Sequence, residues 1–196
     1  MVAAIAAQAA VDFTPGTGQT VLDGLKFPFL IFHENGKQIS YEQPAGWKYS
    51  GDSSHIRFTP PNLAQAQADI DQSSLPAPQD FNDETMKALQ QKTLSSIPPG
   101  SAKAAIVTEE KNPILVNGHE TYEVTVGYEA FGREFQTSVL YLNLPDTQLR
   151  FRATALKADF EKVHRAFRGS VFSWQWHEPQ PEKAQVTVAK APVSTN

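Results

Sequence analysis

Residues 121–156 read TYEVTVGYEAFGREFQTSVLYLNLPDTQLRFRATAL, and they carry the clearest strand pattern of the chain. Apolar and polar residues alternate in three runs, 122–129, 136–144 and 149–156, which is the period of a β-strand. Phe131-Gly132 and Pro145-Asp146 separate the runs and are typical of turns. Short turns between consecutive strands predict an antiparallel meander. In its first strand, Glu123 and Glu129 are expected on a face that is open to water.

Two segments have the pattern of helices. Residues 158–172 place apolar side chains at spacings of three and four, which gives one apolar stripe formed by Leu156, Phe160, Val163, Phe167 and Val171. A middle helix is expected to begin at Asn82-Asp83-Glu84, where the acidic side chains favour the helix dipole. Pro98-Pro99-Gly100 ends it.

More strands are expected ahead of the middle helix. KFPFLIF (26–32) is apolar and aromatic and is interpreted as a buried strand, which forms a hairpin with residues 37–42 around Asn35-Gly36. Shorter strands follow near Ile56 and Ala68. Two short strands, 104–108 and 114–116, are expected after the helix. The predicted fold class is α+β, a twisted antiparallel β-sheet flanked by at least two α-helices.

The expected domain organisation has three parts. Residues 1–24 form an Ala-rich and flexible lead-in, in which 12–24, rich in Gly, Thr and Asp, are expected to be coil. Residues 25–177 form a single domain, and 178–196, rich in Pro, Ala and Lys, form a disordered tail. Ala7-Gln8-Ala9 resembles a signal-peptidase site, although no basic segment precedes it. Export is favoured over the alternative, an Ala-rich helix of a cytosolic protein.

Composition excludes several classes of function. The chain has 196 residues and a net charge of −4, so it lacks the basic surface that nucleic acids require. It contains no cysteine, which removes disulfides, cysteine nucleophiles and cysteine-ligated metals. No apolar run reaches the roughly 20 residues of a membrane span.

The order of these signals resembles a known family. A strand leading to Pro44-Ala45-Gly46-Trp47, a polar strand ending at Pro60-Pro61, a middle helix, a meander and a final aromatic helix are similar to the PsbP-like fold. The relatives include the extrinsic photosystem II subunit, the yeast Ran-binding Mog protein and small bacterial envelope proteins. The resemblance covers residues 25–177 and implies a protein that binds other proteins. It implies no catalytic residue, and the absence of cysteine excludes a lipoprotein anchor.

A search for catalytic and metal-binding motifs predicts no catalytic residue, no metal site and no cofactor. The five histidines lack the H-x-x-x-H spacing that places two imidazoles on one helix face, and they are expected to be solvated. Gly169-Ser170 lacks the flanks of a nucleophile elbow and is expected in the core or at a helix cap. Glu123 and Glu129 are interpreted as a solvated sheet face rather than a catalytic pair.

Four residues are predicted to contact a protein partner: Arg150, Arg152, Trp174 and Trp176. Arg and Trp are frequent at interface hot spots. The alternative is that the arginines meet acidic residues across the sheet and the tryptophans plug its edge. The leading hypothesis for function is therefore a non-enzymatic protein-binding or accessory module. The alternative is a small-molecule-binding protein or weak enzyme with a cleft between the sheet and the middle helix, near Trp47.

Overall fold

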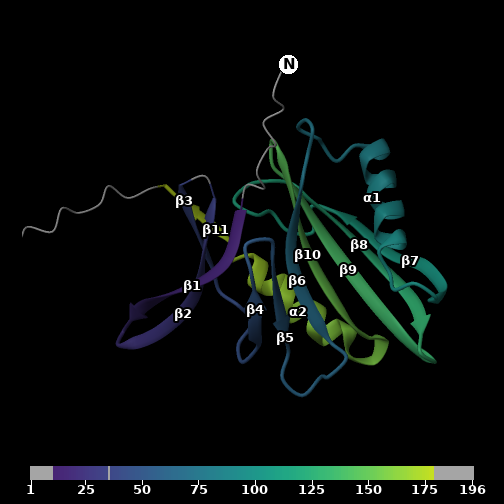
Figure 1. Ribbon diagram of the computed structural model, residues 1–196, viewed down its shortest axis with the longest axis horizontal. Coiled ribbons are helices and arrows are strands. Elements are labelled where there is room, and N and C mark those ends of the chain that lie inside the picture. Colours follow the sequence, from purple (N-terminus) through teal and green to yellow (C-terminus); the bar gives the residue numbers. More distant parts are fainter. Residues whose placement is uncertain (1–10, 35, 179–196) are drawn as a thin grey trace, which may run out of the picture.

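The computed structural model describes residues 11–34 and 36–178, which form eleven strands and two helices (Figure 1). The elements, in chain order, are β1 (Val11–Leu22), β2 (Leu25–Glu34), β3 (Lys37–Tyr41), β4 (Lys48–Gly51), β5 (His55–Thr59), β6 (Gln67–Ser74), α1 (Asp83–Ser95), β7 (Ala102–Lys111), β8 (Thr121–Ala130), β9 (Arg133–Asn143), β10 (Thr147–Leu156), α2 (Lys157–Val171) and β11 (Gln175–His177). The expected Ala-rich start (1–10), Asn35 and the tail from 179 onward lie outside the described residues.

The strands form two sheets instead of the single sheet that was expected. The larger has the order β4-β5-β6-β10-β9-β8-β7 and the smaller β1-β2-β3-β11, with antiparallel pairing throughout. Apolar residues of α2 pack on one face of the larger sheet, and those of α1 pack on the other. The α+β class with an antiparallel sheet and two helices is confirmed.

The meander of β8, β9 and β10 forms as predicted, but its expected water-facing side is wrong. In β8 both faces are buried, and Glu123 is only 5% exposed. The reason is that α2 lies over this face and supplies partners for the carboxylate of Glu123, so the polar face of the strand is covered rather than solvated.

The helices begin and end close to their predicted bounds, whereas two of the strand predictions were too short or wrong. The Asn82 side chain accepts a hydrogen bond from the Thr85 backbone N–H and caps α1. Residues 102–111 form one long strand rather than a short one. Residues 114–116 form no strand, because only Val116 pairs, in an isolated bridge with His119.

Residues 11–22 form a strand, so the expected coil over 12–24 is wrong for this segment. Gly16 lies opposite Ile31 and Gly18 lies opposite Phe29 in the pairing of β1 with β2. A side chain at Gly18 would collide with the ring of Phe29. The glycines thus leave room for bulky residues of the neighbouring strand. The sequence pattern alone indicated flexibility instead.

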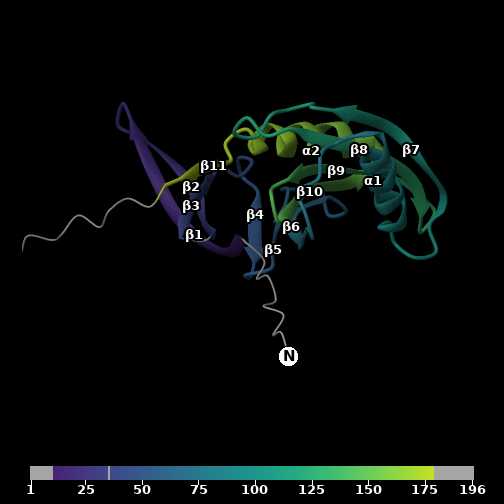
Figure 2. The same ribbon diagram turned by 90° about the horizontal axis from the view of Figure 1, so that it is seen from above.

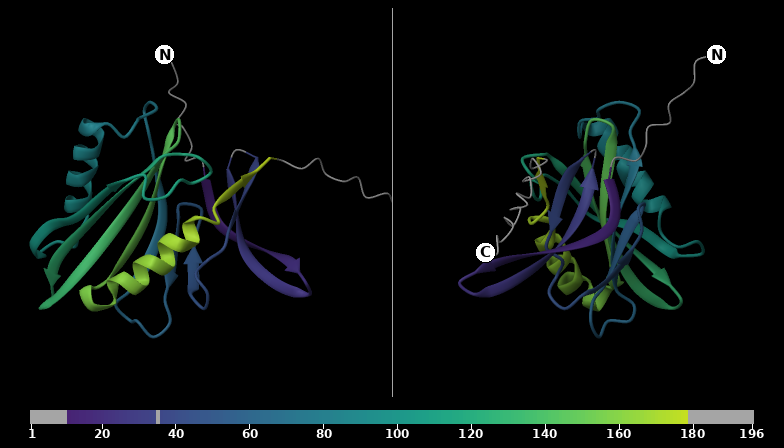
Figure 3. Two further views of the ribbon diagram at one scale, coloured as in Figure 1. Left: turned by 180° about the vertical axis from the view of Figure 1, so that it is seen from behind. Right: turned by 60° about the vertical axis from the view of Figure 1, so that its left-hand side comes forward.

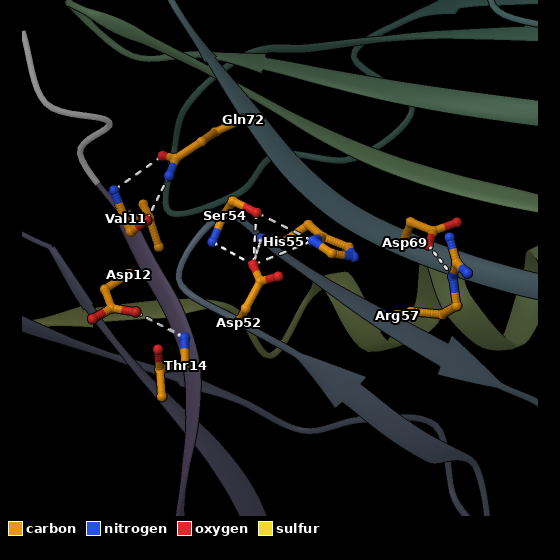
Figure 4. A network of polar contacts seen from close by, with 9 residues as sticks. All are labelled: Val11, Asp12, Thr14, Asp52, Ser54, His55, Arg57, Asp69 and Gln72. Atoms are coloured by element: carbon orange, nitrogen blue, oxygen red, sulfur yellow. Dashed lines mark hydrogen bonds and ion pairs between the residues drawn. The ribbon is translucent and has the colours of Figure 1, made fainter.

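The start of β1 is attached to the larger sheet, while its end projects from the molecule. The Val11 backbone N–H donates to Gln72 Oε1 of β6 over 3.0 Å, and the Gln72 side chain donates back to the Val11 carbonyl (Figure 4). The Phe13 N–H donates to the carbonyl of Ser53. The closed end of the β1–β2 hairpin then extends away from the larger sheet (Figures 2 and 3).

Candidate functional site

The two arginines that were predicted to contact a partner lie on the α1 side of β10. Arg150 faces Asp71 across the β10–β6 pair and forms a salt bridge with it. Arg152 faces Asp69, but Asp69 is paired with Arg57 over 2.7 Å, as Figure 4 shows. The alternative interpretation, in which strand arginines meet acids across the sheet, therefore describes Arg150. Partner binding by Arg150 and Arg152 stays a prediction.

The two predicted tryptophans have different environments. Trp174 is 1% exposed, and its ring packs against Phe13, Phe32, Tyr41 and Phe151. It belongs to the core that joins the two sheets, so its predicted place on a contact surface is corrected. Trp176 lies in β11, is partly buried and lines a cleft. A role for Trp176 in partner binding stays a prediction.

The cleft next to Trp176 has a volume of about 660 Å³ and lies where the two sheets meet. Its walls come from the ends of β2, β3 and β11 on one side and from turns of the larger sheet on the other. The lining residues are Glu34, Lys37, Pro78, Asn117, His119, Leu144, Pro145, Asp146 and Trp176. This volume is in the range of small-molecule sites.

The cleft is not where the alternative hypothesis placed it. The expected cleft lay between the sheet and the middle helix, near Trp47. Trp47 is 8% exposed and stacks on Phe167 of α2, with 6.4 Å between the ring centroids. The Trp47 side chain therefore fills the core beneath α2, and the described cleft lies beside Trp176.

Glu34 lies partly buried in the cleft. Its carboxylate accepts a hydrogen bond from Trp176 Nε1. Burial raises the pKa of Glu34, and the charge of Asp146 raises it further, while the Trp176 bond, Lys37 and His119 act in the opposite direction. The net pKa lies above the ordinary value, because the hydrogen bond and the nearby positive charges do not fully offset the cost of burying the ionised carboxylate.

A second polar cluster is buried between β8, β9 and α2. Glu123 Oε1 lies 2.7 Å from His164 Nε2 and accepts a hydrogen bond from Ser138 Oγ over 2.5 Å. Glu123 Oε2 accepts a hydrogen bond from Arg168 over 2.9 Å. Burial by itself raises the pKa of Glu123, but the bonds from His164, Ser138 and Arg168 outweigh it and hold the pKa below the ordinary value.

This cluster lacks the geometry of a catalytic triad. In a triad, histidine lies between the nucleophile and the acid. Here Ser138 and His164 both contact the same carboxylate oxygen, and Ser138 is 1% exposed. The expectation of a solvated His164 is corrected, because its side chain is 16% exposed and bonded to Glu123. Ser170 has the expected structural role, with bonds to Tyr41 and to the Phe167 carbonyl.

The projecting end of the β1–β2 hairpin exposes large apolar side chains. Directly opposite residues of an antiparallel pair share a face, so the pairs Leu22–Leu25, Thr20–Phe27, Gly18–Phe29 and Gly16–Ile31 lie on the same, outer face. Leu22 is 60% exposed, Leu25 65% and Phe27 43%. We call Leu22, Leu25, Phe27, Phe29 and Ile31 the apolar stripe. Phe29 and Ile31 are partly covered, and they continue it toward β3.

The stripe was missed from the sequence because KFPFLIF was interpreted as one buried strand. Alternation alone does not tell which face of a strand is covered. Leu30 and Phe32 are buried, but the odd-numbered residues of the same strand face outward. Gly16 and Gly18 were a useful signal, because a glycine has no side chain to cover the residue opposite it on the neighbouring strand.

Two further properties of the described residues bear on function. In residues 11–34 and 36–178, no three His, Cys, Asp or Glu side chains gather in a way that could hold a metal ion. Within the same ranges, no helix is both long and apolar enough to cross a bilayer.

Comparisons with known proteins found similarity only among solved structures. No protein-family model matches the sequence, and no curated protein matches it. Protein PA94 of unknown function, from Pseudomonas aeruginosa, is 15% identical, with a TM-score of 0.49 over 78% of this chain and 98% of that chain. LpqN of Mycobacterium tuberculosis, which is involved in cell envelope biogenesis, is 14% identical, with a TM-score of 0.48 over 83% and 91%.

The solved structures that this chain resembles also include a PsbP. Cyanobacterial PsbP (CyanoP) from Synechocystis is 12% identical, with a TM-score of 0.47 over 90% of this chain and 98% of that chain. A PsbP is thus among the similar structures, as the sequence resemblance predicted. At these identities and TM-scores, the similarities do not argue for any function.

Proposed function

We propose that this protein is a non-enzymatic protein-binding module that docks a partner protein on the apolar stripe of the β1–β2 hairpin. The single observation that carries the proposal is the exposure of Leu22, Leu25 and Phe27 on one face of a projecting hairpin. Monomeric proteins rarely expose contiguous apolar surface of this kind without a use for it. This proposal places the contact surface on the smaller sheet rather than on the arginines of β10.

The chemistry of the stripe favours a protein partner. In the hairpin from Phe13 to Phe32, the only acidic or basic residues are Asp23, in the turn, and Lys26, in β2. The stripe runs along the side of the hairpin, from Leu22 to Ile31, and an acidic residue lies at its tip. For the hairpin to insert into a bilayer, the charged side chain of Asp23 at the tip would first have to leave water. An apolar groove on a protein can instead cover the side of the hairpin and leave the tip in water.

A photo-crosslinking experiment tests this proposal. A benzoylphenylalanine residue replaces Phe27 in the full chain, and the same residue replaces Phe172 as a matched control, because Phe172 is also exposed but lies after α2. We expect a discrete crosslinked partner from Phe27 and none from Phe172. The partner should disappear when Leu22→Ser and Leu25→Ser are added, because these changes remove the apolar contact.

Two outcomes would overturn the proposal. Crosslinks only between copies of this chain, with self-association in sedimentation velocity, would make the stripe a dimer interface. Flotation of the chain with neutral phosphatidylcholine vesicles, lost in the Leu22→Ser, Leu25→Ser variant, would make it a membrane contact. Identification of the crosslinked protein by mass spectrometry and its reconstitution from purified components would support the proposal.

We also propose that the protein is exported. The support is the A-x-A pattern at Ala7-Gln8-Ala9, together with the lack of cysteine, which suits an oxidising compartment. Cell fractionation of the native source tests this, and recovery of the chain only with cytosolic marker enzymes would contradict it.

A further inference from the structure

The cleft beside Trp176 has a rigid aromatic wall. The Trp176 indole N–H donates to the Glu34 carboxylate, which fixes one edge of the ring. His119 contacts the ring edge to face, with centroids 5.9 Å apart, and Trp174 packs against it at the same centroid distance. A ring held by three neighbours presents the rest of its surface in one orientation, so little conformational entropy is lost when a ligand binds against it.

The charges of the cleft are predominantly negative. Glu34 comes from the smaller sheet and Asp146 from the turn between β9 and β10, and the charge of Asp146 raises the pKa of Glu34. Among the described lining residues, the only Lys or Arg is Lys37, and its ammonium group lies 2.8 Å from the Glu178 carboxylate. The Lys37 side chain is therefore engaged at the rim, and an anionic ligand would meet two carboxylates inside.

Of the remaining lining residues, Asn117 and His119 are polar and three are apolar. Pro78, Leu144 and Pro145 lie around the two carboxylates and the indole. A purely apolar ligand would leave the carboxylates of Glu34 and Asp146 desolvated without a partner, which is costly. A metal ion would need a group of ligands that residues 11–34 and 36–178 do not bring together here.

We infer that the cleft binds an organic cation, a primary ammonium or guanidinium group on an apolar stem, with Glu34 and Asp146 accepting its N–H groups and Trp176 packing on the stem. Charge-assisted hydrogen bonds and cation–π contacts recognise such a group, and the proline and leucine side chains cover the stem. The ligand can be a lysine or arginine side chain of a polypeptide or a free amine, which present the same chemistry to the cleft.

This site is separate from the apolar stripe. Glu34 ends β2, whereas Leu25 begins it, so the cleft and the tip of the hairpin lie at opposite ends of one strand. The inference does not rest on the proposed protein-binding function, and each can fail while the other holds.

The test uses the 15N-labelled full chain and follows its indole N–H resonances, of which there are three because the chain has three tryptophans. Trp176→Phe assigns the Trp176 signal, which reports on Glu34 through their hydrogen bond. The probes are N-acetyl-arginine methylamide, N-acetyl-lysine methylamide and agmatine. N-acetyl-norleucine methylamide is the neutral control, because it keeps an aliphatic stem without a charge.

We expect the cations to shift the Trp176 indole signal saturably, with a dissociation constant of about 1 mM, and the neutral control to leave it in place. Glu34→Gln and Asp146→Asn should each weaken binding by about tenfold or more, because each removes a charged acceptor. Lys37→Gln should strengthen binding, because it removes a positive charge at the rim that repels a cationic ligand. Glu84→Gln, which makes the same charge change on the exposed face of α1, should have no effect.

The source of the cation follows from the probes that bind. Tighter binding of the capped amino acids than of agmatine supports a polypeptide side chain, and the reverse order supports a free amine. Three results would overturn the inference: equal shifts with norleucine methylamide, cation binding that survives both Glu34→Gln and Asp146→Asn, or no shift at about 20 mM probe. Preserved dispersion of the remaining amide signals shows that each variant is folded, and two independent carboxylate variants keep the test decisive if one is not.

Discussion

The junction of α2 with the larger sheet and the tip of the β1–β2 hairpin differ in the kind of side chain that they place in an unfavourable environment. At the junction, polar groups are buried, and Glu123 is matched by His164, Ser138 and Arg168. At the tip, apolar groups such as Leu22 and Leu25 are exposed. A buried charge must find its partners inside the protein, whereas exposed apolar surface can be covered from outside. The polar cluster around Glu123 is therefore expected to stabilise the fold, whereas the exposed apolar side chains at the tip are free to contact another molecule.

Substitution of Trp174 is expected to affect stability most, and it tests whether this side chain joins the smaller sheet to the larger one. Trp174→Ala should lower the free energy of unfolding by about 3–5 kcal/mol, because the ring packs between Phe32 of the smaller sheet and Phe151 of the larger one. Urea unfolding followed by circular dichroism measures this. Phe172→Ala is the control, since its side chain is exposed and should change stability by less than about 0.5 kcal/mol. Equal effects of the two changes would refute the assignment of Trp174 to the core.

The next effect tests whether the buried polar cluster is stabilised by its pairing. Arg168→Met should destabilise the protein by about 2 kcal/mol, because it leaves the buried Glu123 carboxylate with one charged acceptor site unmatched. Arg165→Met is a matched control on the same helix, because its pair with Glu161 is exposed to water and should contribute little to stability. If chemical denaturation gives the two variants the same stability, the buried pair of Arg168 with Glu123 stabilises the protein no more than an exposed pair does.

The pH dependence of stability sharpens the same point with a smaller effect. The pKa of Glu123 is lowered in the folded state, so its ionised form contributes stability that is fully present above the unfolded-state pKa of about 4.3. That contribution is lost as the pH falls through the folded-state pKa. Measured from pH 6 to pH 3, stability should fall less steeply in Glu123→Gln than in the unchanged protein. Parallel curves would show that Glu123 titrates as an ordinary exposed carboxyl.

The smallest effect on stability is expected at the hairpin tip. Leu22→Ser and Leu25→Ser should each change the free energy of unfolding by less than about 0.5 kcal/mol, because both side chains are mostly exposed. The same variants should abolish the crosslink from position 27. A large loss of thermal stability would mean that the tip packs within the molecule, and the contrast between the two regions would break down.

Local sequence patterns predicted most elements but not their neighbours. The meander of β8–β10 and both helices follow from alternation, from the periodic apolar stripe of α2 and from the Asn82 cap. The strand over residues 11–22 was missed because its glycines are explained only by Phe29 and Ile31 of the adjacent strand. Of the predicted contact residues, Trp176 alone lines the cleft, and its partners Glu34, His119 and Asp146 come from distant parts of the chain.

The α+β class, the antiparallel order of the meander and the amphipathic face of α2 follow from residue patterns alone, because these depend on the period of side chains within one element. The division of the strands into two sheets, the burial of Glu123 and the exposure of Leu22 and Leu25 depend on how the elements pack together. The same packing brings Glu34 and Asp146 to one cleft. The physical reason is that burial and charge pairing are set by what packs against an element, and a pattern within one element does not record its neighbours.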